Sequence, residues 1–161
     1  MSPTIRVGIG HDTHRVKSGG PLRLGGIDID CEFSLVGHSD ADVLLHAVTD
    51  AILGAAALGD IGELFPDHLS ENKNRDSAEM LRLALDQVQS QRYSIQNVDC
   101  IIFAQSPKLS SYKRSIADRI AGLLNIEVDR VGVKAKTGEG VGPVGNHEIM
   151  MAQAVVLLDR R

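Results

Sequence analysis

Apolar residues recur along this chain with two different periods, and these periods divide it into strands and helices. Alternation or short apolar runs predict strands, one of them a broken hairpin, at residues 4–10, 22–30, 95–105, 130–136 and 149–158. Apolar residues three and four positions apart predict helices at residues 41–58, 76–92 and 110–124. This order predicts an α+β fold in one domain, residues 1–161, with helices packed on one face of a mixed β-sheet.

The first and last predicted strands differ in their apolar pattern. In the first, Ile5, Val7 and Ile9 lie on one side, as an alternating strand requires. In the last, residues 149–158 form a nearly continuous apolar run, which is typical of a central strand covered on both faces. Between the last two strands, residues 138–145 contain four glycines, which permit close approach of the backbone to a ligand or a partner.

A narrow polar stripe interrupts the apolar helix predicted at residues 41–58, which Ser39 or Asp40 can cap. Its members stand at helical spacing and are Asp42, His46, Thr49 and Asp50. The residues around them are too apolar for a fully exposed helix. We therefore expect the stripe to line a cleft or an interface.

A carboxylate and an imidazole stand two residues apart at Asp12 and His14. In an extended strand both side chains point to the same face, so they can converge on one divalent cation. His46 of the polar stripe is the best third ligand. Asp50, one turn further along, can orient an imidazole or be a plain structural residue.

Composition and charge narrow the function classes. The net charge of −4 and the 3% aromatic content argue against general nucleic-acid binding. Cys31 and Cys100 lack the spacing of a paired-ligand motif, which predicts two free thiols in a reducing compartment. The first residues do not show a charged segment followed by an apolar one, and no apolar run is long enough to span a membrane, so we expect a cytoplasmic enzyme or binding protein without a targeting segment.

Several longer motifs resemble the 2-C-methyl-D-erythritol 2,4-cyclodiphosphate synthase family, in the family's order and over essentially the whole chain. They comprise Gly10-His11-Asp12-Thr13-His14, residues 37–51, residues 54–62, Phe65-Pro66-Asp67, residues 104–108 and residues 133–139. The resemblance implies a phosphorus-oxygen lyase of the non-mevalonate isoprenoid pathway. Its substrate would be 4-diphosphocytidyl-2-C-methyl-D-erythritol 2-phosphate, and its products the 2,4-cyclodiphosphate and CMP. It also implies a homotrimer with one active site between each pair of neighbouring subunits.

The resemblance further implies roles for individual residues. Asp12, His14 and His46 match the ligands of one Zn²⁺ per subunit, in agreement with the spacing argument, and leave a tetrahedral site one open position. Glu139 matches the ligand of a second divalent cation, Mg²⁺ or Mn²⁺, and His38 and Thr137 match the transition-state stabilisers. The implied substrate contacts are Asp12, His14, His38, Ser39, Asp60, Ile61, Gly62, Phe65, Pro66, Asp67, His68, Leu69, Ala104, Gln105, Ser106, Pro107, Lys108, Leu109, Ser110, Lys136, Thr137, Gly138 and Glu139.

The chain also departs from the family's usual residues, at Leu69, Lys136, Pro143 and Asn146. Lys136 either adds a phosphate contact or is a solvated lysine at a strand end. The family often has Arg where Asn146 stands and can bind an isoprenoid diphosphate at the trimer axis. The change at Asn146 weakens the case for that axial site, not for the chemistry.

Two other functions fit the same three candidate ligands. A mononuclear zinc hydrolase would need a general base, for which the sequence offers Asp50 or Glu63. A structural zinc protein or trimer-forming binding protein would need a fourth protein ligand, usually cysteine. Neither Cys31 nor Cys100 stands at a recognisable spacing from the three candidates.

Overall fold

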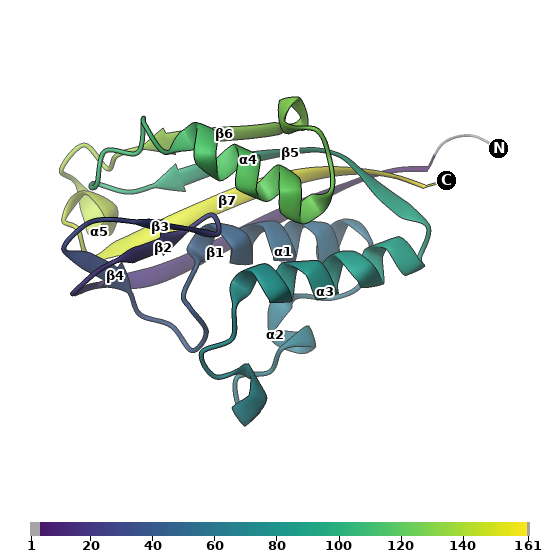
Figure 1. Cartoon of the computed structure of the whole chain (residues 1–161), viewed down its shortest axis with the longest axis horizontal. Helices are drawn as coiled ribbons and strands as arrows, with labels where there is room; N and C mark the ends of the chain where they lie inside the picture. The colour runs from purple at the N-terminus through teal and green to yellow at the C-terminus, as the bar shows by residue number, and fades with distance from the viewer. Residues whose placement is uncertain (1–3, 161) are drawn as a thin grey trace.

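A five-stranded mixed sheet forms the frame of the protein, whose structure, a computed structural model, describes residues 4–160 (Figure 1). Its strands are β1 (Thr4–Ser18), β4 (Phe33–Leu35), β5 (Tyr93–Phe103), β6 (Val131–Lys136) and β7 (Ile149–Arg160), and β2 (Leu22–Leu24) and β3 (Ile27–Ile29) form a separate hairpin. The helices are α1 (Val43–Ala55), α2 (Ile61–Leu64), α3 (Ser77–Ser90), α4 (Lys113–Leu124) and α5 (Gly142–Gly145), with 3₁₀ turns at Ser70–Asn72 and Val128–Arg130.

The strand order is β4-β1-β7-β5-β6, with β7 at the centre. β7 runs antiparallel to both β1 and β5, whereas β5 and β6 are parallel. The long pairing of β1 with β7 runs from Thr4 opposite Arg160 to Arg15 opposite Ile149. The predicted mixed sheet is therefore confirmed.

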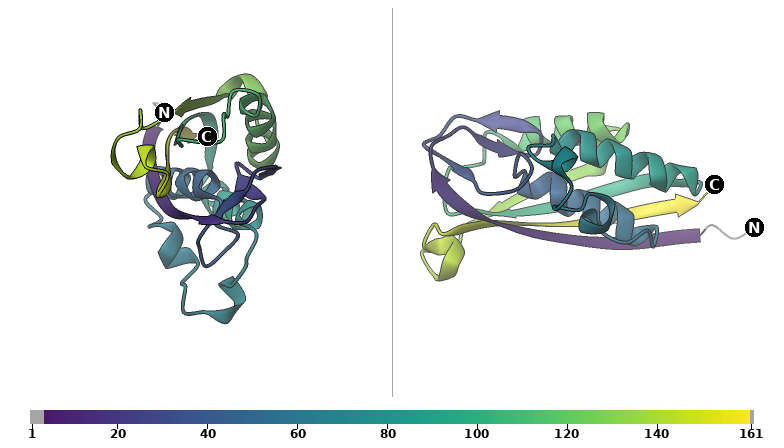
Figure 2. Two further views of the ribbon diagram at one scale, coloured as in Figure 1. Left: turned by 90° about the vertical axis from the view of Figure 1, so that its left-hand side faces the viewer. Right: turned by 90° about the horizontal axis from the view of Figure 1, so that it is seen from below.

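The three long helices lie together on one side of the sheet, as predicted (Figure 2, right). α1 packs across β1 and β7, and α4 covers β6. Alternate residues of β7 are buried beneath these helices, namely Met150, Ala152, Ala154, Val156 and Leu158. The core is mainly aliphatic, as expected for a chain with few aromatic residues.

α1 approaches β1 closely because glycines face it. A Cβ atom on Gly8 would overlap the carbonyl oxygen of Ala51, and one on Gly10 would overlap that of Ala47. The alternate residues of β1 point away from the helices, which leaves Ile5, Val7 and Ile9 60%, 66% and 71% exposed. The apolar side of the first strand is thus its outer side.

This outer side extends across the sheet and corrects the prediction that the last strand is covered on both faces. In the part of the chain that the structure describes, Val155 of β7 is exposed beside Ile9. We call this surface the outer face; its apolar members are Ile5, Val7, Ile9, Ile101, Phe103, Met151, Val155 and Leu157. Within a single chain the prediction fails, because an apolar run in one sequence does not reveal whether the same chain or another covers it.

The Gly10 contact predicts a large effect on stability. Gly10→Ala should lower the free energy of unfolding by about 3 kcal/mol, because β1 and α1 must separate to admit the methyl group. Gly122→Ala is the matched control: Gly122 lies on α4 with nothing near its Cβ position, and the change should stabilise by up to about 1 kcal/mol. Urea denaturation of both variants measures the difference, and equal stabilities would contradict this packing.

The element boundaries differ from the sequence predictions in three respects. β1 continues to Ser18, so Asp12 and His14 lie inside the strand and not at its end. α1 is capped by Asp42 and not by Ser39 or Asp40. β4, α2 and α5 were not predicted, because elements of three or four residues carry too little periodicity to be recognised.

Asp42 has a structural role and does not line the cleft that was expected for the polar stripe of residues that includes it. It is fully buried, and its Oδ1 accepts hydrogen bonds from the N–H groups of Leu45, 3.0 Å away, and Gly25, 2.9 Å away. Its Oδ2 accepts from Gly26 N–H at 2.7 Å, which ties the β2–β3 turn to the start of α1. Burial raises the pKa of Asp42, although these N–H groups oppose the shift.

The structure also bears on the two cysteines and on the expected lack of a membrane-spanning segment. Cys31 and Cys100 are both free thiols, as expected, and burial raises the pKa of Cys100 to about 12. Among residues 4–160, none of the helices is long and apolar enough to cross a membrane.

Candidate active site

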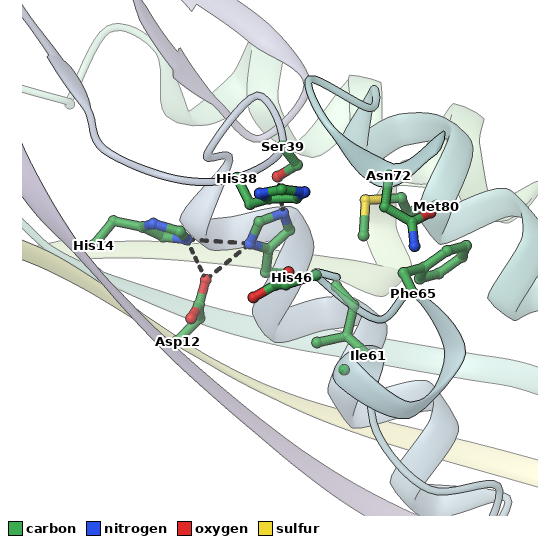
Figure 3. Close-up of a pocket in the computed structure, with 11 residues that line it drawn as sticks. Asp12, His14, His38, Ser39, His46, Ile61, Phe65, Asn72 and Met80 are labelled. Atoms are coloured by element: carbon green, nitrogen blue, oxygen red, sulfur yellow. Dashed lines mark hydrogen bonds and ion pairs between the residues drawn. The ribbon is translucent and has the colours of Figure 1, made fainter. Parts of the chain in front are cut away.

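Asp12, His14 and His46 converge on one point between β1 and α1 (Figure 3). Asp12 Oδ2 lies 2.8 Å from His14 Nε2 and 3.0 Å from His46 Nδ1. The two imidazole nitrogens are 3.2 Å apart. The glycines of β1 make this possible, because they bring the helix that carries His46 close to the strand.

Hydrogen bonds on the far side of each ring determine which nitrogen faces this point. His14 Nδ1 lies 2.6 Å from the carbonyl oxygen of Val36, which can only accept, so Nδ1 carries the proton. His46 Nε2 lies 2.7 Å from Ser77 Oγ and 3.0 Å from Ser39 Oγ. With hydrogen on these outer nitrogens, His14 Nε2 and His46 Nδ1 present lone pairs to each other and to the carboxylate.

Three acceptor atoms this close together require a positive charge between them. Burial disfavours the charged carboxylate, but the hydrogen bonds and charge interactions with both imidazoles outweigh it and hold the pKa of Asp12 well below its usual range. Burial also disfavours the imidazolium, but the Asp12 carboxylate outweighs it and raises the pKa of His14. Without a metal, a shared proton meets the requirement.

A divalent metal ion fits the same position. Two imidazole nitrogens and a carboxylate oxygen form an ordinary Zn²⁺ donor set, and the far-side hydrogen bonds are of the kind that orient ligating histidines. Among the described residues, the group that could hold a metal has these three members only, which leaves one tetrahedral position for water or substrate.

Proton and metal should therefore compete for His14 Nε2. Because its pKa is raised above 6.5, the apparent Zn²⁺ affinity should be constant above that raised pKa. Below it, the affinity should fall about tenfold per pH unit as one proton is displaced. Competition with a chromophoric chelator from about pH 5 to pH 8.5 measures this dependence. An affinity that stays level over the whole range would contradict it.

The three residues form one wall of a cavity of about 200 Å³ (Figure 3). The remaining lining residues are His38, Ser39, Ile61, Gly62, Phe65, Asp67, Asn72 and Met80. The guanidinium of Arg75 stacks over the Phe65 ring 5.0 Å from its centre, and Arg75 also donates to Asn72. Asn72 donates in turn to the Pro66 carbonyl, so the wall opposite the metal position is tied down.

Most of the predicted substrate contacts between residues 104 and 137 line a second cavity, of about 360 Å³, at the far edge of the sheet. Its lining comprises Ala104, Gln105, Pro107, Lys108, Leu109, Ser110, Lys113, Ala135, Lys136 and Thr137. Thr137 donates to the Glu139 carboxylate, and Gln105 Oε1 accepts from the backbone N–H groups of Gly138 and Gly140. The structure thus brings the residues around 104–110 and 135–140 together.

Within one chain, the two cavities lie apart. Asp12 pairs with Ala152, Ala152 with Ile102, and Ile102 with Ala135, so three strand spacings separate the first from the last. This is about 14 Å, and the fully buried Ala152 and Ile102 occupy the helix-covered side between them. Glu139 and Thr137 therefore do not join the Asp12–His14–His46 cluster in the same chain.

Several predicted residues are placed differently from expectation, and those that line neither cavity include Pro66, Leu69, Ser106, Gly138 and Glu139. Asp50 does not orient an imidazole: its Oδ1 accepts from Ile61 N–H at 2.8 Å. Asp60 is not among the lining residues of the cavity, and it caps α2 by accepting from Glu63 N–H. His68 is exposed outside both cavities.

The sequence analysis missed Ser77, Asn72 and Met80 at this site. Ser77 is the first residue of α3, whose N-terminus Asp76 caps by accepting from Ala78 N–H, and a serine at a helix start is too common to signal a second role. Asn72 and Met80 carry no spacing signal. Their position follows from the return of the chain from α2 to α3 over the cavity.

The fold and the cluster together define a class of protein, namely α+β proteins with a candidate metal site in the wall of a cavity. Comparison with known proteins narrows this class, because the model of the YgbB family matches residues 5–159. A 2-C-methyl-D-erythritol 2,4-cyclodiphosphate synthase from Rhodopirellula baltica is 51% identical over 157 residues, which cover 98% of this chain and 95% of the relative. The chain therefore belongs to the YgbB family of 2-C-methyl-D-erythritol 2,4-cyclodiphosphate synthases, enzymes of isoprenoid biosynthesis.

Solved structures of such enzymes have the same fold. The bifunctional IspDF from Campylobacter jejuni matches with a TM-score of 0.96 and 42% identity over 99% of this chain. This chain spans 43% of the length of that longer protein. A CDP complex of IspF from Plasmodium falciparum matches with a TM-score of 0.86 and 36% identity, covering 98% of this chain and 97% of that one.

Proposed function

We propose that this enzyme converts 4-diphosphocytidyl-2-C-methyl-D-erythritol 2-phosphate into 2-C-methyl-D-erythritol 2,4-cyclodiphosphate and CMP. In this reaction the 2-phosphate oxygen attacks the outer phosphorus of the diphosphate, and CMP leaves in line. The main support for the proposal is that Asp12, His14 and His46 each direct a metal-ligating atom toward one point on the wall of a cavity. Because nucleophile and electrophile are both anionic, positioning and charge neutralisation are most of the catalytic task.

The side chains around the first cavity suit that task. Asp12, His14 and His46 would hold Zn²⁺, which supplies Lewis-acid polarisation and neutralises phosphate charge. His38 and Ser39 line the same cavity and can donate hydrogen bonds to phosphate oxygens beside the cluster. Ile61, Gly62 and Phe65 form the adjoining wall, which suits the methylerythritol portion.

The second cavity suits the cytidine and the diphosphate. Its backbone and polar groups between residues 104 and 110 can read a base edge, and the related P. falciparum enzyme was solved with CDP. Lys136 and Thr137 line the same cavity, which favours a phosphate contact for Lys136 over a merely solvated side chain. Glu139 beside them would hold the second divalent cation, Mg²⁺ or Mn²⁺.

The separation of the two cavities supports an active site shared between subunits. A substrate that contacts the cluster of one chain cannot reach across about 14 Å of buried core to the second cavity of the same chain. The outer face offers the contact surface, because a broad apolar patch on a sheet usually marks a protein–protein interface. We therefore propose a homotrimer in which neighbouring chains complete each site.

The rival functions have less support from the geometry. A hydrolase needs a free general base beside metal-bound water, but Asp50 is engaged with Ile61 N–H, and Glu63 is not among the residues that line the cavity. A structural zinc needs a fourth protein ligand, and the group found among residues 4–160 offers three.

CMP release tests the proposal directly. Incubation of the pure protein with the cytidine diphosphate substrate, Zn²⁺ and Mg²⁺ should yield CMP and the cyclic diphosphate in equal amounts. Treatment with EDTA should abolish turnover, and Zn²⁺ with Mg²⁺ should restore it. CMP together with the open-chain 2,4-bisphosphate, or release of inorganic phosphate from the 2-phosphate, in place of the cyclic product would instead indicate the hydrolase.

A further inference from the structure

We propose that Ser77 and Asp40 form a positioning pair that fixes the His46 ring and keeps its Nδ1 free of hydrogen for the metal. The inference rests on the proposed metal site. His46 Nε2 lies 2.7 Å from Ser77 Oγ, and the Ser77 hydroxyl donates a hydrogen bond to Asp40 Oδ1. The contacts run from Asp40, before α1, through Ser77, the first residue of α3, to the ring of His46 on α1.

The direction of each hydrogen bond follows from which groups can donate. An ionised carboxylate only accepts, so the one hydroxyl proton of Ser77 must point to Asp40. Ser77 Oγ can then only accept from His46, which must carry its hydrogen on Nε2. The remaining nitrogen, Nδ1, is therefore the bare one, and it lies 3.0 Å from Asp12 Oδ2.

Both oxygens of the Asp40 carboxylate are engaged as acceptors. Its Oδ2 accepts from Ser77 N–H at 3.1 Å, and its Oδ1 accepts from Asp42 N–H at 3.2 Å. Arg23 Nε lies 3.8 Å from Oδ2. The carboxylate also stands at the N-terminus of α3, where the helix dipole stabilises negative charge. Asp40 thus receives hydrogen bonds and donates none.

Ser39 is the other hydroxyl near His46, but it cannot set the direction in the same way. Its Oγ lies 3.0 Å from His46 Nε2 and accepts from Ala41 N–H at 3.3 Å. Among the described residues, no carboxylate bonds to the Ser39 hydroxyl, so its proton is free to turn. Ser77 is fully buried and has Asp40 behind it, so the directing role falls to Ser77.

Two substitutions and one control test the positioning pair. Ser77→Ala should lower the Zn²⁺ affinity by about 10- to 100-fold, the usual effect of losing a group that orients a ligating histidine. Asp40→Asn should have a similar effect, because an amide N–H can donate to Ser77 and turn the hydroxyl proton toward His46. Ser77→Thr keeps the hydroxyl and should stay within about threefold of wild type. Ser115→Ala, the same change near the start of α4, should leave the affinity unchanged.

A second measurement determines which nitrogen of the His46 ring carries the hydrogen. In ¹⁵N spectra of the metal-free protein at about pH 8.5, His46 should carry hydrogen on Nε2 in wild type and populate both tautomers in Ser77→Ala. The signal is assigned by its loss in His46→Gln. Thermal unfolding and circular dichroism would show whether a variant has lost its fold. If Ser77→Ala does not fold, the positioning role is tested by the Zn²⁺ affinity of Ser77→Thr and by the His46 tautomer of the wild type.

Three results would overturn the inference. They are an Nδ1–H tautomer in the wild type, an unchanged tautomer in a folded Ser77→Ala, or an unchanged Zn²⁺ affinity in that variant. The proposed function can fail separately. If the wild type binds no Zn²⁺, the metal assignment is lost, and the tautomer measurement still tests the positioning pair.

Discussion

His46→Ala is expected to lower turnover by about 10³-fold or more and to remove Zn²⁺ binding. His46 supplies one of three donor atoms, and two remaining ligands cannot hold the ion in a defined position. Metal polarisation of a phosphate contributes several kcal/mol to transition-state stabilisation, and each 1.36 kcal/mol changes the rate tenfold. The measurements are CMP release and metal content after dialysis against Zn²⁺.

A control on the same helix separates loss of the ligand from loss of packing. Thr49 is also buried on α1, one turn from His46, and its hydroxyl donates to the Leu45 carbonyl. Thr49→Val removes this hydrogen bond without touching the cluster and should keep both Zn²⁺ and activity. Full cyclase activity in His46→Ala would refute the metal assignment.

The second large effect is expected from a charge on the outer face. Ile9→Glu should dissociate the proposed trimer into monomers and lower turnover by about 100-fold or more, because each monomer would hold two separated half-sites. Ile9 is 71% exposed in the single chain, so the fold itself should accept the change. A carboxylate buried at a subunit interface without a partner carries a large desolvation cost.

Light scattering after size exclusion measures the assembly, and Zn²⁺ binding should persist because one chain supplies all three ligands. Leu83→Glu on α3 is the matched control. Leu83 is an exposed apolar residue, 38% accessible, on a helix that packs on the opposite side of the sheet, and its variant should remain assembled and active. An Ile9→Glu monomer with wild-type turnover would refute the shared active site.

Sequence periodicity predicted the long elements because each of them repeats its signal over several turns or residue pairs. β5, β6, α3 and α4 lie close to their predicted ranges. β4, α2 and α5 are three or four residues long, and their existence depends on tertiary contacts, such as the pairing of Leu35 with Val16 or the Asp50 bond to Ile61. A pattern in one short window cannot contain such information.

The convergence of Asp12, His14 and His46 could be predicted because strand and helix geometry place each residue on a known side. The distance between β1 and α1 could not, since it depends on two glycines that meet backbone carbonyls. For Asp50 and Asp42, in contrast, helical spacing alone predicted a role at the site that the structure does not give them. Both share the helical spacing of His46, yet hydrogen bonds to Ile61 and to the β2–β3 turn engage them elsewhere.

The antiparallel pairing of β1 with β7 has a practical outcome for protein engineering. Thr4 stands opposite Arg160, so both ends of the described chain emerge side by side. Asp12 lies eight residues further along β1, roughly 26 Å from that end. A tag, a tether or a whole second enzyme joined at either end can therefore extend away from the reaction centre, an architecture compatible with bifunctional relatives such as the C. jejuni protein.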